Sequence, residues 1–135
     1  IAKNIFVFWV SSEKEFYTSD FPIVVSPHVE DARPMYMGLA QYGGEMTIPL
    51  SPEIVLSVYD RGYFNDMESL DGSFIKADAK EIRRQNLLRY FYASRHVFSY
   101  KRDFGLIDSA YQLKGKHIFM KPNLNSEIVS GLGRY

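Results

Sequence analysis

Strand-like segments are gathered in the first part of this chain, and its clearest helix signal comes after them. Aromatic and β-branched runs, bounded by Gly, Pro, Asn and Ser, predict strands before residue 60. A helix is predicted from Asp78 to about Arg95 (78–95). Strands followed by a helix are typical of an α+β fold, whereas the two alternate in a doubly wound sheet. We therefore expect α+β: a mostly antiparallel β-sheet with one long helix packed on a face and a shorter second helix.

The predicted strands are short and separated by turn residues. A long loop between Ser26 and Glu45 interrupts them, and a polar connection runs from Asp60 to Gly72. The strands are expected at Asn4 to Val10, Phe16 to Thr18, Pro22 to Val25, Met46 to Leu50 and Ile54 to Tyr59. Later segments are a short strand at Val97 to Tyr100, a second helix at Asp103 to Leu113, a last strand at His117 to Met120 and a polar tail from Asn123.

The long helix has a defined start and one expected buried face. Asp78 and Glu81 have the capping-box spacing, an N-cap acceptor with a carboxylate three residues on. At 100° per residue, Lys80, Arg83 and Arg84 lie away from the expected core face. That face carries Ala79, Ile82, Asn86, Tyr90 and Ala93. A buried Asn must be hydrogen-bonded, so Asn86 is expected to tie the helix to a strand end.

The size of the chain fits one domain. At 135 residues and 15.6 kDa there is no room for two independent cores, so residues 1–135 are expected to form a single domain. The apolar run Ile5 to Val10 is far shorter than the roughly 20 residues of a membrane span and reads as a buried strand. Because the chain enters that strand almost at once, we expect a C-terminal fragment of a longer cytoplasmic protein, with no membrane partner.

Charge is balanced overall but divided along the chain. The formal net charge is zero. Residues 11–71 hold eleven acidic and three basic residues, a net of −8, and residues 76–102 hold eight basic and two acidic residues, a net of +6. We expect the two regions to pair within the molecule, with Arg83 and Arg84 neutralised by acids of the first region. The same division suits self-association or a protein partner.

Sequence signatures of common sites are absent. The chain has no Cys, which rules out thiolate metal sites and a cysteine nucleophile. His28, His96 and His117 are isolated, and neither a nucleophile elbow nor a phosphate-binding glycine loop occurs. No metal and no cofactor is expected.

A catalytic alternative rests on polar residues between strand-like segments. Asp20 and Ser19 stand in a turn, and Arg95 and His96 follow the long helix. A hydrolase-like site would use His96 as base, Asp20 to orient it and Arg95 to hold an anion, with Ser51 as a further polar candidate. The competing interpretation is turn chemistry, in which Ser and Asp side chains bond nearby backbone amides.

A nucleic-acid alternative rests on the basic segment 76–102. Its cations alternate with Tyr90, Phe91, Tyr92, Phe98 and Tyr100, and phosphates need cations while bases need rings. The competing interpretation places the rings in the core and the cations on carboxylates of the same chain. Zero net charge favours the latter, so nucleic acid is ranked last.

Three motifs resemble those of a known family. Residues 16–22 read FYTSDFP, residues 48–52 read IPLSP, and the helix carrying Asn86 ends in ASRHVFS at residues 93–99. In content and order they resemble the C-terminal part of the uncharacterised, mainly prokaryotic family known as domain of unknown function 4238, over about Ile5 to Ser99. The resemblance implies no reaction. The family's N-terminal block, with a His-Tyr-Val-Pro-like motif, has no counterpart here, so a site that it helps to build would be incomplete.

The expected function is therefore a non-catalytic binding or interaction module of a larger protein. The hydrolase-like site around Asp20 and His96 is the first alternative, and nucleic-acid binding through Arg83, Arg84 and their neighbours is the second.

Overall fold

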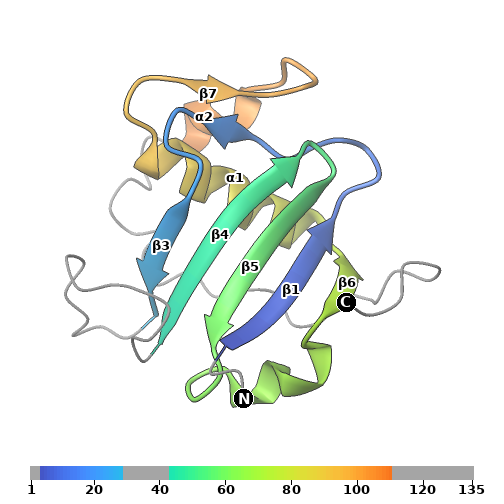
Figure 1. Cartoon of the computed structure of the whole chain (residues 1–135). Coiled ribbons are helices and arrows are strands. Elements are labelled where there is room, and N and C mark those ends of the chain that lie inside the picture. Colours follow the sequence, from blue (N-terminus) through green and yellow to red (C-terminus); the bar gives the residue numbers. More distant parts are fainter. Residues whose placement is uncertain (1–3, 29–42, 111–135) are drawn as a thin grey trace.

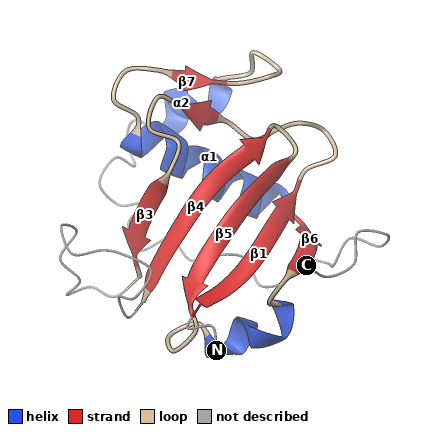
Figure 2. Cartoon of the chain, viewed as in Figure 1, coloured by secondary structure: helices blue, strands red, loops and turns tan. Residues whose placement is uncertain are grey.

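The computed structural model describes residues 4–28 and 43–110. A five-stranded sheet with the order β3-β4-β5-β1-β6 carries the long helix α1 across one face (Figure 1). All neighbouring strands are antiparallel except β1 and β6, which are parallel. A separate two-stranded ladder of β2 and β7 lies beyond the end of the main sheet (Figure 2). The predicted α+β fold with a mostly antiparallel sheet is confirmed.

The elements are short and mostly adjacent along the chain. The main sheet contains β1 (Asn4–Val10), β3 (Val24–Pro27), β4 (Gly44–Ser51), β5 (Ile54–Asp60) and β6 (Ser73–Lys76). The small ladder contains β2 (Thr18–Ser19) and β7 (Val97–Phe98), and the helices are η2 (Asn65–Leu70), α1 (Ala79–Tyr92) and α2 (Gly105–Ala110).

Strand β1 forms the centre of the core. Its residues alternate in burial: Ile5, Val7 and Trp9 are fully buried, whereas Phe8 and its neighbours on the other face are half-buried. This is the period of two that places successive side chains on opposite faces of a sheet. On the second face, Phe8 stacks on Phe74 of β6 with ring centroids 4.5 Å apart. The apolar run that opens the chain is therefore a core strand, as predicted.

The connection after β5 is more structured than its polar sequence predicts. It contains the 3-10 helix η2, and Met67 on that helix is fully buried. It leads into β6, a strand that the sequence analysis does not predict, because four residues are too few to display a clear alternation. Gly72 enters β6 with φ 76°, a value that favours glycine, and its N–H donates to the Phe6 carbonyl.

Several boundaries differ from those predicted. Strand β2 is restricted to Thr18–Ser19, β3 begins later and reaches Pro27, and β7 ends at Phe98. The predicted long loop therefore starts and ends inside strands, and its residues 29–42 lie outside the described residues. Helix α2 begins after the predicted start at Asp103, and the predicted strand at His117 to Met120 and the tail from Asn123 also lie outside the described residues.

Helix α1 begins as predicted but ends sooner and presents a different face. Asp78 is the N-cap, and its Oδ1 accepts a hydrogen bond of 2.9 Å from the Glu81 N–H. Ala93 is already extended, so the predicted end at Arg95 is too late. The predicted core face is correct at Asn86, which is buried, and in part at Ile82, which is half-buried and packs against the core. It is wrong at Ala79, which is exposed, and Tyr90 and Ala93 are only half-buried. The buried residues of α1 are Glu81, Arg84, Gln85, Asn86, Leu87, Leu88 and Arg89.

The face that α1 turns toward the sheet differs from the predicted one because a buried charge cluster lies between the helix and the sheet. We give this name to His28, Glu45, Glu81, Arg84 and Arg89. The Arg84 guanidinium binds both Glu45 carboxylate oxygens at 2.8 Å and Glu81 Oε2 at 2.8 Å. His28 Nε2 lies 2.7 Å from Glu45 Oε1. Arg84 is paired with both carboxylates, and Arg89 donates to Thr47 Oγ1 and Gln85 Oε1, so the polar side of α1 can face the sheet.

Two opposing effects set the pKa values in the cluster: burial disfavours the charged form of each group, and pairing with an opposite charge favours it. Burial acts to raise the pKa of Glu45, but the facing Arg84 guanidinium and the His28 hydrogen bond bring it well below its usual value. Burial acts to lower the pKa of Arg84, but Glu45 and Glu81 hold it well above its usual value. Arg89 has no such carboxylate pair, and burial lowers its pKa to about 9. The cluster therefore contains one fully compensated arginine and one poorly compensated arginine.

Replacing the two arginines should have unequal effects on stability. Arg84→Met leaves Glu45 and Glu81 buried without their cation, which should lower the free energy of unfolding by about 3 to 5 kcal/mol. Arg89→Met should change it by no more than about 1 kcal/mol, because a poorly paired buried charge is removed. Within the described residues, Arg89 Nε and Nη1 have no hydrogen-bond partner. Urea unfolding followed by the fluorescence of Trp9 measures both, and equal losses would contradict this account.

Acid should destabilise the protein through Glu45. The pKa of Glu45 is lowered in the folded state, so its stabilising contribution is complete above the unfolded value of about 4.3 and is lost as the pH falls below it. Over about pH 2 to 4, the parent should lose about 1.4 kcal/mol per pH unit more than the Glu45→Gln variant. Urea titrations at several pH values test this, with Glu53→Gln as the exposed control. Identical slopes for parent and Glu45→Gln would refute the assignment.

Candidate functional site

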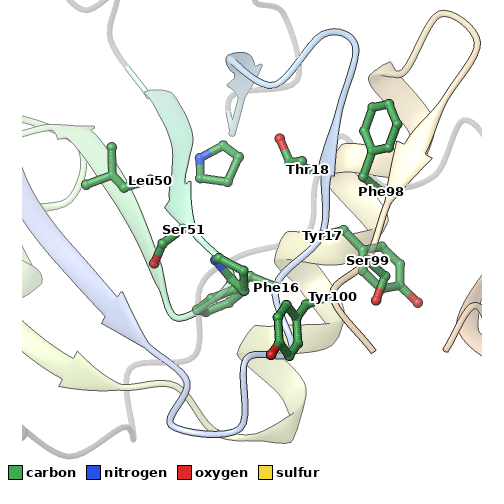
Figure 3. Close-up of a pocket in the computed structure, with 10 residues that line it drawn as sticks. Phe16, Tyr17, Thr18, Leu50, Ser51, Phe98, Ser99 and Tyr100 are labelled. Carbon is green, nitrogen blue, oxygen red and sulfur yellow. The ribbon is translucent and has the colours of Figure 1, made fainter. Parts of the chain in front are cut away.

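Three distant parts of the chain meet around one depression, which we call the aromatic groove. It is lined by residues 16–18 before and within β2, residues 49–52 at the β4–β5 turn, and residues 98–100 in and after β7. Its volume is about 410 Å³. Figure 3 shows Leu50 and Ser51 on one wall and Phe98, Ser99 and Tyr100 on the other. Each of the three family-like motifs contributes to this groove.

Apolar side chains are unusually exposed around the groove. Leu50 is 55% exposed, Phe98 53% and Tyr100 63%, whereas Phe16 is buried. Lys14 places its ammonium 4.6 Å from the centroid of the Tyr100 ring. Exposed apolar groups of this size, gathered at one place, are characteristic of surfaces that bind something. From the sequence, Phe98 and Tyr100 are expected in a short strand and as rings of the basic segment, and Leu50 is not expected in a site.

The β4–β5 turn shapes one wall of the groove. The pairing of β4 with β5 shifts register between Pro49 and Ser51, where a proline cannot donate a ladder hydrogen bond. Ser51 Oγ then accepts a hydrogen bond of 3.1 Å from the Glu53 N–H. Ser51, predicted as a polar site residue, therefore lies in the groove wall and also holds the turn.

The four candidate catalytic residues lie together, but the side chains of Asp20 and Ser19 bind backbone groups. The Asp20 carboxylate accepts from the Ser94 N–H at 3.0 Å and from the Arg95 N–H at 2.8 Å. The Asp20 N–H donates to the His96 carbonyl at 3.2 Å. Ser19 Oγ accepts from the Phe21 N–H at 3.1 Å. This is the turn chemistry that the sequence analysis weighs against catalysis.

Asp20 and His96 do not form a side-chain pair in the described part of the chain. Loss of contact with water acts to raise the pKa of Asp20. Hydrogen bonds from the Arg95 and Ser94 amides outweigh this effect and leave the pKa below its usual value. The exposed His96 ring lies nearly parallel to Phe98, with centroids 6.1 Å apart. Asp20 thus anchors the segment that follows α1, and this segment carries β7 to the groove.

Asn86 holds the segment that contributes Phe16 and Tyr17 to the groove wall. It is buried, its Oδ1 accepts from the Tyr17 N–H at 2.8 Å, and its Nδ2 donates to the Glu15 carbonyl at 2.9 Å. The Tyr17 hydroxyl donates to the Asp103 carbonyl at 2.7 Å. Asn86 is expected to tie the helix to a strand end, and it does bind the residues that directly precede β2, which holds residues 15–17 in place.

A second, more polar pocket of about 420 Å³ adjoins the groove and shares Tyr17 and Ser99 with it. Arg83, Asn86 and Lys101 are among its lining residues, so two of the predicted binding residues meet here. Arg83 is exposed, but Arg84 is buried in the charge cluster and is not available to a ligand. The predicted neutralisation of Arg83 and Arg84 by acids of the first region is confirmed for Arg84, which pairs with Glu45, but no ion pair of Arg83 occurs among the described residues.

Residues 4–28 and 43–110 contain no group of three or more His, Cys, Asp or Glu side chains arranged to hold a metal ion. Within the same ranges, no helix has the length and apolar character needed to cross a membrane.

The comparisons with known proteins identify a family without an assigned activity. The chain belongs to the family described as Protein of unknown function (DUF4238), whose family model matches residues 1–103. The match spans the main sheet, α1 and the aromatic groove. No curated protein and no solved structure gives a significant match to the chain. The resemblance noted in the sequence is therefore confirmed.

Removing the Asn86 tie should loosen the groove wall. Asn86→Leu leaves the Tyr17 N–H and the Glu15 carbonyl without their partner, which should lower the free energy of unfolding by about 1 to 3 kcal/mol. The exchange of the Tyr17 amide hydrogen, measured by NMR, should become faster. Arg83→Leu on the neighbouring exposed position is the control and should change neither quantity. Parent-like protection of the Tyr17 amide in Asn86→Leu would contradict this role.

Proposed function

We propose that this chain is a non-catalytic binding module whose contact surface is the aromatic groove. The observation that carries the proposal is the exposure of Leu50, Phe98 and Tyr100 by more than half around a single depression. Binding energy at protein interfaces is concentrated in a few large side chains, aromatic ones above all, that become buried on contact. These three side chains are available for such burial.

The polar groups near the groove support binding rather than catalysis. Asp20, Ser19 and Asn86 use their side chains to hold backbone segments. A general base must lie within hydrogen-bond reach of the proton that it removes. The Asp20 carboxylate accepts two backbone N–H groups and is not paired with the His96 side chain in the described part of the chain, which favours a structural role for it.

Single-stranded nucleic acid is a second candidate, favoured by one observation. Phe98 and Tyr100 are exposed, and Arg95, Lys101 and Arg102 on the same stretch are exposed too. Aromatic rings beside cations can stack bases and contact phosphates. Against it, Arg84 and Arg89 of the basic segment are buried, which removes two cations from the surface. We therefore rank a protein segment above nucleic acid.

The proposal also covers the cellular location and the partner of this module. We place it in a bacterial cytoplasmic protein, supported by the mainly prokaryotic family that the motifs resemble and by the absence of cysteine. The partner is another protein or a second copy of the chain. Light scattering over a range of protein concentrations at low salt distinguishes the two, because self-association increases with concentration.

A peptide selection tests the groove directly. A phage-displayed library of random peptides of about twelve residues is selected on the whole chain, and the enriched peptides are titrated by fluorescence anisotropy. Phe98→Ala combined with Tyr100→Ala should weaken binding by at least roughly tenfold, because both rings lose their buried contact.

Phe21→Ala is the matched control, since Phe21 is equally exposed but does not line the groove. It should bind the peptides as the parent does. Circular dichroism establishes that all variants remain folded, as expected for exposed side chains. A library that yields no peptide, or peptides that the double variant binds as tightly as the parent, would reject the proposed function.

A further inference from the structure

The side of the main sheet that faces away from α1 is apolar, and we call it the outer sheet face. In β1 its residues alternate with Ile5, Val7 and Trp9, which belong to the core on the α1 side. Its middle consists of directly opposite residues of β1 and β5, namely Phe6 with Val58, Phe8 with Leu56, and Val10 with Ile54. Val58 is buried, and the others are half-buried.

The neighbouring strands continue this apolar surface. Met46 and Ile48 of β4 lie opposite the β5 residues, and Phe74 of β6 stacks on Phe8. An antiparallel sheet with one side in water usually carries polar residues at these alternate positions. Apolar residues on both sides are instead typical of a sheet that is covered on both sides.

Polar residues of the outer sheet face stand at its margins. Lys76 ends β6 beside Val10 and is exposed. Asn4 and Asp60 are paired at the other end of β1 and β5, and the Asp60 carboxylate accepts from the N–H groups of Gly43 and Tyr63. An apolar centre with a polar rim is the arrangement found in protein interfaces.

The described helices pack on the other side of the sheet. Figure 1 views the outer sheet face with α1 behind it. Met67 of η2 lies in the same core cluster as Ile5 and Trp9, and α2 contacts α1. Within residues 4–28 and 43–110, no helix therefore covers the outer sheet face.

We propose that the outer sheet face docks on the same face of a second copy of this chain. Sheets pack face to face through apolar side chains, and a single self-complementary patch is enough to close a two-fold dimer. A second copy supplies an apolar face of the same size and strand spacing. With the two-fold axis along or across the strands, the two Lys76 side chains lie at different corners and do not oppose each other. This surface is not the aromatic groove, so the inference goes beyond the proposed function.

The size of the outer sheet face fits a weak dimer. Strands β1, β4 and β5 have 7, 8 and 7 residues, and β3 and β6 have 4 each. With strands about 4.8 Å apart and a rise of about 3.3 Å per residue, they present a flat area of roughly 500 Å². Two copies together cover roughly 1,000 Å², which is the lower limit for a specific interface. We therefore expect a dissociation constant in the micromolar range.

Sedimentation of the whole chain over a range of concentrations tests the dimer. Between about 1 μM and 1 mM, the chain should pass from monomer to dimer, as expected for an interface of this size. Leu56→Lys places a charge at the centre of the face and should weaken association by at least roughly tenfold. Phe98→Lys makes the same kind of change at an exposed position outside the face and should associate as the parent does. Added salt should not weaken the dimer, because its contact is apolar, whereas association between charged regions would weaken.

A second measurement leaves the apolar residues unaltered, in case Leu56→Lys does not fold. The chain has no cysteine, so Lys76→Cys carries a single spin label at one corner of the face. The labelled chain is mixed with isotope-labelled parent, and NMR detects broadening of parent signals near the label. Broadening should be confined to amides of the main sheet and should be absent at Phe98 and Tyr100.

The outcomes separate this inference from the proposed function. A chain that stays monomeric at all these concentrations overturns the inference. A dimer that is lost in Phe98→Lys but retained in Leu56→Lys, or broadening centred on Phe98 and Tyr100, also overturns it and moves the contact between copies to the aromatic groove. A dimer that depends on Leu56, in a chain that selects no peptide, supports this inference and rejects the proposed function.

Discussion

The bidentate contact between Arg84 and Glu45 sets the position of the helix on the sheet. Arg84 lies on α1 and Glu45 on β4, and Glu81 completes the pairing from the preceding turn of the helix. All three side chains are buried, so each would be costly without its partners. Apolar contacts tolerate rotation of a helix by part of a turn, whereas a two-point contact between guanidinium and carboxylate does not. The cluster thus specifies one orientation of α1.

The aromatic groove depends on that orientation. With α1 fixed, Asn86 faces residues 15–17 and holds them by two hydrogen bonds. At the end of the helix, Asp20 accepts from the amides of Ser94 and Arg95, which brings β7 against β2. Two of the segments that line the groove are therefore held in part by these polar contacts. A surface built in this way can keep apolar groups exposed without losing its shape.

Much of the fold could be predicted because its signals are local. The alternation in β1, the cap at Asp78 and the turn chemistry around Asp20 each depend on residues close in sequence. The failures were of two kinds. Strand β6 was missed because its pairing partner, β1, is remote in sequence and its own pattern is short. The buried face of α1 differs from the predicted one because Arg84, which helical periodicity places away from the core face, is buried through its pairing with Glu45 and Glu81.

The sequence by itself determined the class of fold, the start of the helix, the structural role of Asn86 and the family to which the chain belongs. Only the tertiary structure decided that Arg84 belongs to the interior and that Leu50, Phe98 and Tyr100 surround one depression. The physical reason is the range of the interactions. Caps, turns and strand periodicity are fixed within a few residues, whereas the pairing of Glu45 with Arg84 and the meeting of three segments require contacts between positions far apart in the chain.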